Sequence, residues 1–430
     1  MATRLVIRGG TVVNPQQSTH EADILIEDGR IIDIGGTYAD DSESIDATDC
    51  LVLPGLVNGH AHGCTTGPLF SSGAMPLGEE QALSNAERHL RAGVTTLVNV
   101  CGFGLPSDRI DHQLDIHLGT THLPAAVEAA DLVDASGMQE RHRQMTAQRM
   151  IENGAVALGE IGSGATLGGG VAAYRYVPDA LEGPLGRRLA PEEATVLIDA
   201  LVGPSRLDEP DDGALALALQ ALGVSADLAP EVRAAILRYA SAPVLASLRS
   251  FTEATELSEQ LNVPAVFHVA RPSAKTLLHL ARHTNARIVA GHVNHTSFTP
   301  DEAVEVARQL RAEGATIDVS SLDIVQARRL ATPDVADALA REGLVDTLST
   351  DYAGGAWEPM LGVVQRWIDA GYVTLEEGIA MCTETPAKVF GFEDRGRIAR
   401  GLRADLAIVA GDNVSDVRWV VAEGQVVDCG

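Results

Sequence analysis

The residues with the clearest chemical potential stand in the segment Leu51–His62, which reads LVLPGLVNGHAH. An apolar run and a Pro-Gly break lead into a short predicted strand that ends in His60 and His62. Side chains alternate between the two faces of a strand, so these two imidazoles point the same way. Two converging imidazoles suit one metal ion. On its own, this spacing is as consistent with two incidental histidines at a strand end as with a metal site.

Further residues of ligand type share one position, the carboxyl end of a predicted strand: Glu160, His268, His292 and Asp351. In a barrel of parallel strands these ends meet at one face, where catalytic groups lie. Imidazole nitrogen and carboxylate oxygen are ligands that zinc and related metals take. A lone histidine is often polar packing, but the whole set together predicts a metal centre.

The elements that must position these residues alternate between strands and helices. Strands are predicted at 56–60, 95–100, 155–161, 265–269, 287–290, 316–319 and 347–350. Such alternation is typical of parallel strands in a barrel or an open sheet. A barrel needs an eighth strand, the third in order, which we expect within His122–Ala129. The spacing of His112, His117 and His122 suits no regular face, so we expect loop or surface histidines there.

Both ends of the chain read as short strands punctuated by glycine and aspartate turns. We expect residues 1–54 and 393–430 to build one small β-sandwich beside a barrel domain at 55–392. Residues 170–240 interrupt the alternation and are too long for an ordinary loop. They predict a helical insertion that either covers the mouth of the barrel or mediates contacts in an oligomer.

The composition excludes some classes of partner. The chain has 430 residues and a net charge of −27, which argues against nucleic acid or an anionic membrane as a partner. Its five cysteines show no CxxC spacing, which indicates a reducing compartment without a disulfide framework. There is no signal-peptide pattern and no apolar run of membrane-spanning length, so a cytoplasmic location is expected.

The pattern as a whole resembles the amidohydrolase superfamily, metal-dependent hydrolases built on a (β/α)8 barrel. The matching segments, in order, are PGLVNGHAH at 54–62, GVTTLVN at 93–99, FHVA at 267–270, AGHVNH at 290–295, STDY at 349–352, TPAKVFGF at 385–392 and GRIARGLRADLAIV at 396–409. They span nearly the whole chain apart from the insertion. The resemblance implies an α/β fold with a TIM-type barrel and a small β-sandwich.

One departure from the commonest pattern points to a branch of the superfamily. Many two-metal members bridge their ions with a carbamylated lysine on the fourth strand. This chain has only Lys275 and Lys388, and neither stands there. Glu160 occupies the position instead, as in the branch that includes enamidase and adenine deaminase. The segment after His62 lacks the glutamate associated with adenine deaminase, so enamidase is the closer likeness.

The resemblance implies a two-metal centre with the ligands His60, His62, Glu160, His268, His292 and Asp351. One ion would be held by the first two histidines and Asp351, the second by His268 and His292, with Glu160 bridging both. A hydroxide between the ions would be the nucleophile, and Asp351 would be the general acid/base. Zinc is the first choice for this ligand set, and iron or manganese would also suit it.

Four residues beyond the metals are candidates for substrate contacts. Arg271 could hold a substrate carboxylate in a bidentate contact, or could be an ordinary surface arginine. His295 could act catalytically by donating a hydrogen bond to the substrate carbonyl or the developing oxyanion. Tyr352 and Trp357 could line the pocket or pack within a loop.

The predicted function is hydrolysis of a C–N bond in a cyclic amide or lactam, with a carboxylate-bearing heterocycle as one version of the small-molecule substrate. The alternative is an aminohydrolase that deaminates an N-heterocycle with the same metal set, which free ammonia would identify. A third hypothesis is a catalytically silent assembly protein, against which the intact ligand set argues. A homo-oligomer is expected.

Overall fold

A parallel sheet of eight strands forms the centre of the computed structural model, which describes residues 4–15, 19–38, 43–167, 171–321, 323–325, 328–329, 333–352 and 354–430. The strands are hydrogen-bonded in chain order. They are β6 (Leu56–Ala61), β7 (Val94–Asn99), β8 (Asp115–Thr120), β9 (Ala157–Ile161), β10 (Pro264–His268), β11 (Arg287–Gly291), β12 (Thr316–Ser320) and β15 (Thr347–Ser349). This order confirms the predicted α/β class and barrel.

Two backbone hydrogen bonds join the first and last strands of the barrel. The N–H of Asp351 donates to the carbonyl of His60, and the N–H of His62 donates to the carbonyl of Tyr352, both at 2.8 Å. We call residues 60–62 and 351–352 the seam. The first and last strands of the nearly closed barrel are therefore joined at residues that the sequence indicates as candidate ligands.

The third barrel strand differs from the prediction. It is Asp115–Thr120, whereas the expected range His122–Ala129 mostly belongs to helix α2, Pro124–Val133. Proline at the first helical position and several alanines explain the helix. The strand carries His117, so the expectation of a loop or surface histidine was wrong for that residue. His122 does lie in the loop that follows the strand, but it is buried there.

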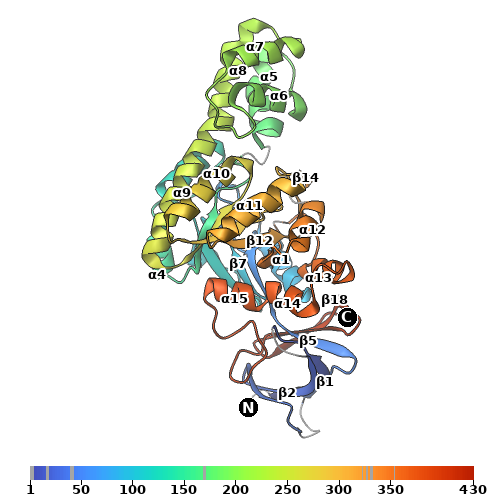
Figure 1. The fold of residues 1–430 in the computed structure, drawn as a ribbon. Coiled ribbons are helices and arrows are strands. Elements are labelled where there is room, and N and C mark those ends of the chain that lie inside the picture. Colours follow the sequence, from blue (N-terminus) through green and yellow to red (C-terminus); the bar gives the residue numbers. More distant parts are fainter. Residues whose placement is uncertain are drawn as a thin grey trace.

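Helices cover the outside of the barrel (Figure 1). They are α1 (Glu79–Arg91), α2, α3 (Glu140–Arg143), α4 (Ala147–Glu152), α9 (Ala242–Leu261), α10 (Arg271–His283), α11 (Pro300–Ala312), α12 (Pro333–Arg341), α13 (Met360–Asp369), α14 (Leu375–Cys382) and α15 (Glu384–Phe390), with a 3-10 turn at Pro106–Asp108. Helix α11 shows how local sequence sets a start. Thr299 and Glu302 bond reciprocally to each other's backbone N–H groups, which satisfies two donors that a helix end leaves free.

A second sheet, drawn at the bottom of Figure 1, combines both ends of the chain. Its strands are β1 (Arg4–Val12), β2 (His20–Glu27), β3 (Arg30–Ile34), β4 (Glu43–Asp46), β5 (Cys50–Pro54), β17 (Leu406–Ala410), β18 (Asn413–Ala422) and β19 (Gln425–Asp428). Antiparallel pairing of β5 with β17 joins the two ends, and Ile7, Ile24 and Ile408 are fully buried in its core. This confirms one unit built from both ends, while the domain boundaries remain predictions.

The insertion forms a helical lobe with a core of its own. Its helices are α5 (Val177–Leu185), α6 (Pro191–Val202), α7 (Asp212–Ala221) and α8 (Ala229–Ile236), with π-helical turns at Ala172–Tyr176 and Leu237–Ser241 and a 3-10 turn at Ala226–Leu228. Leu197, Leu219 and Ile236 are buried among these helices. Figure 1 shows the lobe next to the start of α9, far from the chain-end sheet. Its two expected roles stay predictions.

A small antiparallel sheet follows the last barrel strands. It consists of β13 (Asp323–Val325), β14 (Arg328–Arg329) and β16 (Ala356–Trp357). Within the described ranges, no helix combines the length and the apolar character needed to span a bilayer.

Candidate metal centre

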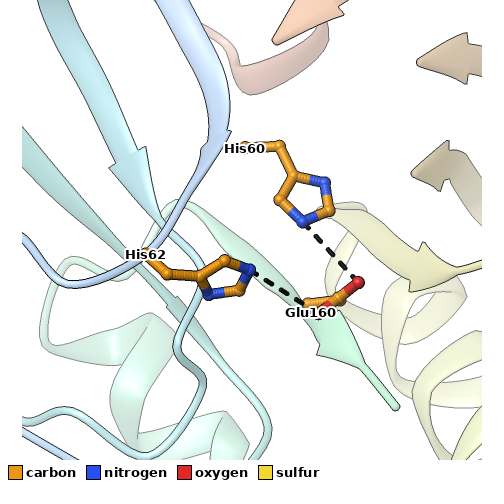
Figure 2. Close-up of side chains that lie close together, drawn as sticks. All are labelled: His60, His62 and Glu160. Atoms are coloured by element: carbon orange, nitrogen blue, oxygen red, sulfur yellow. Dashed lines mark ion pairs between the residues drawn. The ribbon is translucent and has the colours of Figure 1, made fainter. Parts of the chain in front are cut away.

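Six side chains of ligand type converge at the carboxyl ends of the barrel strands. They are His60 and His62 on or just after β6, Glu160 on β9, His268 on β10, His292 just after β11 and Asp351 just after β15. Figure 2 shows the first two histidines directed toward the Glu160 carboxylate. The structure thus brings together all six candidates from the sequence, and their role as metal ligands stays a prediction.

Glu160 lies at the centre of this cluster. Its Oε1 is 2.9 Å from Nδ1 of His268, 2.7 Å from Nε2 of His292 and 3.6 Å from Nε2 of His60. Its Oε2 is 3.7 Å from Nε2 of His62. Both carboxylate oxygens therefore have imidazole neighbours, as a bridging ligand requires.

Neither lysine competes with Glu160 for this position. Glu160 lies on the fourth strand of the barrel and is buried. Lys275 is exposed on α10, and Lys388 is exposed on α15, where it pairs with Glu384 at 3.1 Å. The carboxylate is thus the anionic group that the fourth strand presents to the cluster.

Asp351 closes the cluster from the other side of the seam. Its Oδ1 is 3.0 Å from Nε2 of His62 and 3.5 Å from Nε2 of His60. Asp351 and His292 both have left-handed backbone conformations, with φ of +48° and +36°. This region is uncommon for residues other than glycine, and such residues cluster at functional sites.

The separations around His60 and His62 fit a bound ion. Two ligand atoms at zinc bond lengths of about 2.0–2.1 Å and a tetrahedral angle lie about 3.4 Å apart. The contacts of His60 and His62 with Glu160 and Asp351 measure 3.0–3.7 Å. Two groups could hold a metal, His60–His62–Glu160 and Glu160–His268–His292, and they share the carboxylate.

Unpartnered nitrogens give a second test of the fit. His60 Nε2, His268 Nε2 and His292 Nδ1 are buried and have no hydrogen-bond partner among the described residues. Buried polar atoms in proteins are normally paired, so an orphaned atom needs an explanation. An ion at the cluster would give the His60 nitrogen, which faces both carboxylates, its partner.

The electrostatics of the cluster favour a cation. Burial alone would raise the pKa of Glu160, but the adjacent His268 and His292 rings outweigh it and hold that pKa well below its usual value. Burial opposes protonation of His292, yet the Glu160 carboxylate at its Nε2 raises the pKa of His292 to about 9. An ionised carboxylate that draws a proton onto its neighbour also attracts a metal ion to the same place.

Two residues that the sequence did not reveal stand behind the paired histidines. Nδ1 of His60 is 3.7 Å from Oδ2 of Asp318, and Nδ1 of His62 is 3.6 Å from Sγ of Cys101. The signal for Asp318 was a lone charged residue in a buried strand, and the signal for Cys101 was its place just after β7. Metal-binding histidines usually present their second nitrogen to such a group.

His295 is buried at the edge of the cluster, with its ring 5.4 Å from that of His268 and 5.7 Å from that of His292. Burial and these two rings hold the pKa of His295 well below its usual value, so the ring is neutral. Its Nδ1 accepts from the backbone N–H of Ser297 at 3.1 Å. The proton therefore resides on Nε2, which makes that atom a donor.

Arg271 points away from the cluster. Its side chain is 42% exposed, and its Nη2 donates to Oε2 of Glu302 at 2.7 Å. Helix α10 begins at this residue, which turns its side chain toward the start of α11. The predicted contact with a substrate carboxylate would require the Glu302 pair to open.

Tyr352 and Trp357 pack against α1 in the structure. Their rings lie 5.0 Å apart, and both lie edge-on to the His89 ring of that helix. The hydroxyl of Tyr352 accepts from Nη1 of Arg88 at 2.7 Å. These contacts are loop packing, the second of the two roles considered for these residues, and a role in lining the pocket stays a prediction.

A profile of the amidohydrolase family matches residues 181–428, more than half of the chain. Over 68 residues the chain is 43% identical to 5-methylthioadenosine/S-adenosylhomocysteine deaminase of Halobacterium salinarum. This match covers 15% of this chain and 16% of that protein. Over 135 residues it is 35% identical to D-hydantoinase of Streptomyces coelicolor. This match covers 29% of this chain and 26% of that protein. The matched segments thus span about a quarter of these curated relatives or less.

Solved structures of similar fold extend over the whole chain. Beta-aspartyl dipeptidase of Fervidobacterium islandicum AW-1, in complex with a β-Asp-Leu dipeptide, has a TM-score of 0.59 and 16% identity, covering 100% of this chain and 97% of that one. Dihydropyrimidinase of Brevibacillus agri NCHU1002 has a TM-score of 0.53 and 18% identity, covering 99% and 95%. At this identity the likeness concerns the fold, a barrel with a sheet from the chain ends.

Proposed function

Because the chain belongs to the amidohydrolase family, whose members bind divalent metals, we propose that it hydrolyses a C–N bond in a cyclic amide or lactam at a two-metal centre. The observation that carries the proposal is Glu160, whose two oxygens face histidines from opposite parts of the barrel. The names of a hydantoinase and a dihydropyrimidinase among the similar proteins support ring amides as the substrate class. Placement in the enamidase branch belongs to this proposal.

The residues that would hold the ions are His60, His62, Glu160, His268, His292 and Asp351. When bound, divalent ions lower the pKa of water and polarise a carbonyl, which prepares both partners for attack. Zinc is the ion proposed first, because it suits mixed imidazole and carboxylate ligands. A homo-oligomer in the cytoplasm completes the proposal.

Asp351 would move the proton. Burial opposes its ionisation, but hydrogen bonding to His62 and the nearby His60 lower the pKa of Asp351 to about 2. The carboxylate is therefore ionised and can accept the proton of the attacking water, then pass it to the leaving nitrogen. Its side chain is 14% exposed, more than those of His60 and His62, so it faces the open side of the cluster.

His295 would bind the substrate carbonyl. Its Nε2 carries the proton of a neutral ring, so it donates a hydrogen bond as negative charge develops on the carbonyl oxygen. A neutral ring amide needs no guanidinium partner, and Arg271 already pairs with Glu302. We therefore place neutral cyclic amides first in a screen and carboxylate-bearing rings second.

The test is metal content followed by a substrate screen. Protein purified without chelator should contain about two transition-metal equivalents per chain, and it should open hydantoin, dihydrouracil or lactam rings as followed by chromatography. Removal of the metal should abolish turnover, and its return should restore it. Full activity of the metal-free protein, or no turnover of any such ring by the two-metal protein, would overturn the proposal.

A deaminase is the second candidate, favoured by the match to 5-methylthioadenosine/S-adenosylhomocysteine deaminase. The same ligand set could serve a single ion and a water attacking an amino-bearing carbon of an N-heterocycle. Ring opening of a simple cyclic amide releases no ammonia, whereas deamination releases one equivalent. An ammonia assay on both substrate classes therefore separates the two functions.

A further inference from the structure

Cys101 lies at the ring nitrogen of His62 that does not face the carboxylates. Its Sγ is 3.6 Å from His62 Nδ1, while Nε2 of the same ring faces Glu160 and Asp351. Both Cys101 and His62 are about 1% exposed, so no solvent competes for this contact. The thiol therefore contacts the candidate ligand from behind.

The other hydrogen bonds of the sulfur favour a proton on Nδ1 of His62. The backbone N–H of Gly63 donates to Sγ at 3.4 Å, and the thiol can donate to Oδ1 of Asn99 at 3.8 Å. With its own proton engaged at Asn99, the sulfur can only accept from His62 Nδ1. A thiolate would also accept, so the direction of this hydrogen bond does not depend on the ionisation of Cys101.

We propose that Cys101 is a positioning residue that holds the proton of His62 on Nδ1 and so keeps Nε2 free to bind a metal ion. The inference rests on the proposed function, because it concerns how a ligand of that metal centre is held. It assigns to a thiol the task that a carboxylate or carbonyl usually performs behind a metal-binding histidine. Asp318 stands in the corresponding place behind His60.

Cys64, in the loop that follows β6, offers a matched control. It is fully buried, like Cys101, and its Sγ is 4.0 Å from Nδ1 of His89. That nitrogen is already 2.9 Å from the carbonyl of Asn85, and His89 is not one of the candidate ligands. A Cys64→Ala variant therefore removes a buried thiol beside a histidine without touching the metal centre.

The experiment measures cobalt binding by the full-length protein after its metal has been removed. Competition with a chromophoric chelator should show that Cys101→Ala weakens one of two cobalt sites about 10- to 100-fold, the range known for groups behind metal-binding histidines. Cys101→Ser keeps an acceptor and should recover part of the loss. Cys64→Ala should change neither site by more than about threefold. Thermal unfolding of each metal-free variant checks that it folds.

The cobalt spectrum separates positioning from direct binding. The wild-type protein should show cobalt d–d bands without a thiolate-to-cobalt charge-transfer band. Such a band, lost in Cys101→Ala, would overturn the inference by making the sulfur a ligand. Equal affinity of Cys101→Ala and the wild type for both ions would overturn it as well, while the two-metal function stands. If the wild type binds no metal, the proposed function fails and the inference fails with it.

Discussion

Charged and polar side chains gather at both ends of the barrel, and the two sets differ in how fully their buried atoms are paired. At the start of the strands, Arg395 donates to Thr96, Asp115 and Asp394 at 2.6–2.8 Å. At the carboxyl ends, both ring nitrogens of His60 are buried without a hydrogen-bond partner among the described residues. The guanidinium of Arg395 thus has a completed set of polar contacts, whereas the cluster around Glu160 forms an incomplete set.

This difference distinguishes polar groups that stabilise the fold from polar groups that could bind a ligand. Burial of a charge costs free energy unless hydrogen bonds and opposite charges compensate for it. The guanidinium of Arg395 receives that compensation from the protein itself, and it ties the segment between α15 and β17 to the barrel strands β7 and β8. The histidines around Glu160 receive it only in part, which is what a ligand-binding site requires.

The largest effect is expected from Glu160→Gln, which removes the proposed anionic bridge from the incomplete set. An amide offers one weak acceptor oxygen in place of two charged ones, so the protein should lose at least one metal equivalent. We expect kcat/KM to fall by at least about 10³-fold, measured beside metal analysis. Glu305→Gln, on the exposed face of α11, is the control. Unchanged metal content in Glu160→Gln would disprove the bridge.

Asp351→Asn should sharpen the comparison by separating binding from chemistry. The variant keeps an oxygen near His62 but no longer accepts a proton, so kcat should fall by about 10²- to 10⁴-fold. Metal content should fall much less than activity, because the other candidate ligands remain. The measurements are steady-state kinetics and metal analysis of the same sample. A loss of both ions with full recovery of activity at high metal concentration would show that Asp351 is only a ligand.

Arg395→Met should have the opposite profile, with lower stability and intact chemistry. Removing one partner of a partly buried pair leaves the other uncompensated. Because Asp115 is 28% exposed, we expect a loss of about 2 kcal/mol in unfolding free energy. The shift of the urea midpoint measures it. Arg418→Met, which breaks an exposed pair with Asp416, should cost less than about 0.5 kcal/mol. Loss of metal in Arg395→Met would contradict the division between the two ends.

The smallest effect is the pH dependence of the completed set. Burial alone would raise the pKa of Asp115, but His117 and Arg395 outweigh it and hold that pKa well below its usual value. A carboxylate with a lowered folded pKa stabilises the protein fully above its unfolded pKa of about 3.9, and this stabilisation is lost as the pH falls through the folded value. The free-energy difference between the wild type and Asp115→Asn should be constant from about pH 5 to 8. It should shrink by about 0.7 kcal/mol at about pH 3.5. Urea titrations at these pH values measure it, and a constant difference down to about pH 3.5 would contradict the assignment.

Most of the barrel could be predicted from sequence because seven of its strands are short runs of mainly apolar and β-branched residues. The exception, β8, carries Asp115 and His117 among its apolar residues. Asp115 is compensated by Arg395, which lies 280 positions away, and no local pattern could show that pairing. Helix α2, which follows β8, has strong local signals for a helix, yet the predicted strand overlaps this helix.

The candidate ligands could be predicted because each stands on or just after a barrel strand, a position that the sequence makes visible. Cys101 and Asp318 could not be, since their interest depends on which nitrogen of a distant ring faces them. Arg271 illustrates the converse limit, and its contact with substrate stays a prediction. Its place three residues after His268 suggested proximity, but the start of α10 directs its side chain to Glu302.

The seam has a consequence for how the molecule is made. Asn58 in β6 bonds Thr350 across 292 positions of sequence, beside the backbone bonds of His60 and His62 with residues 351 and 352. During synthesis, β6 therefore cannot pair with the residues after β15 until most of the chain has been made. Until then His60 and His62 lack Asp351, so an ion captured early would be held by few ligands. Under the proposed function we therefore expect metal loading to be a late step of maturation, and we expect chelation to speed amide hydrogen exchange in β6 and β15 together.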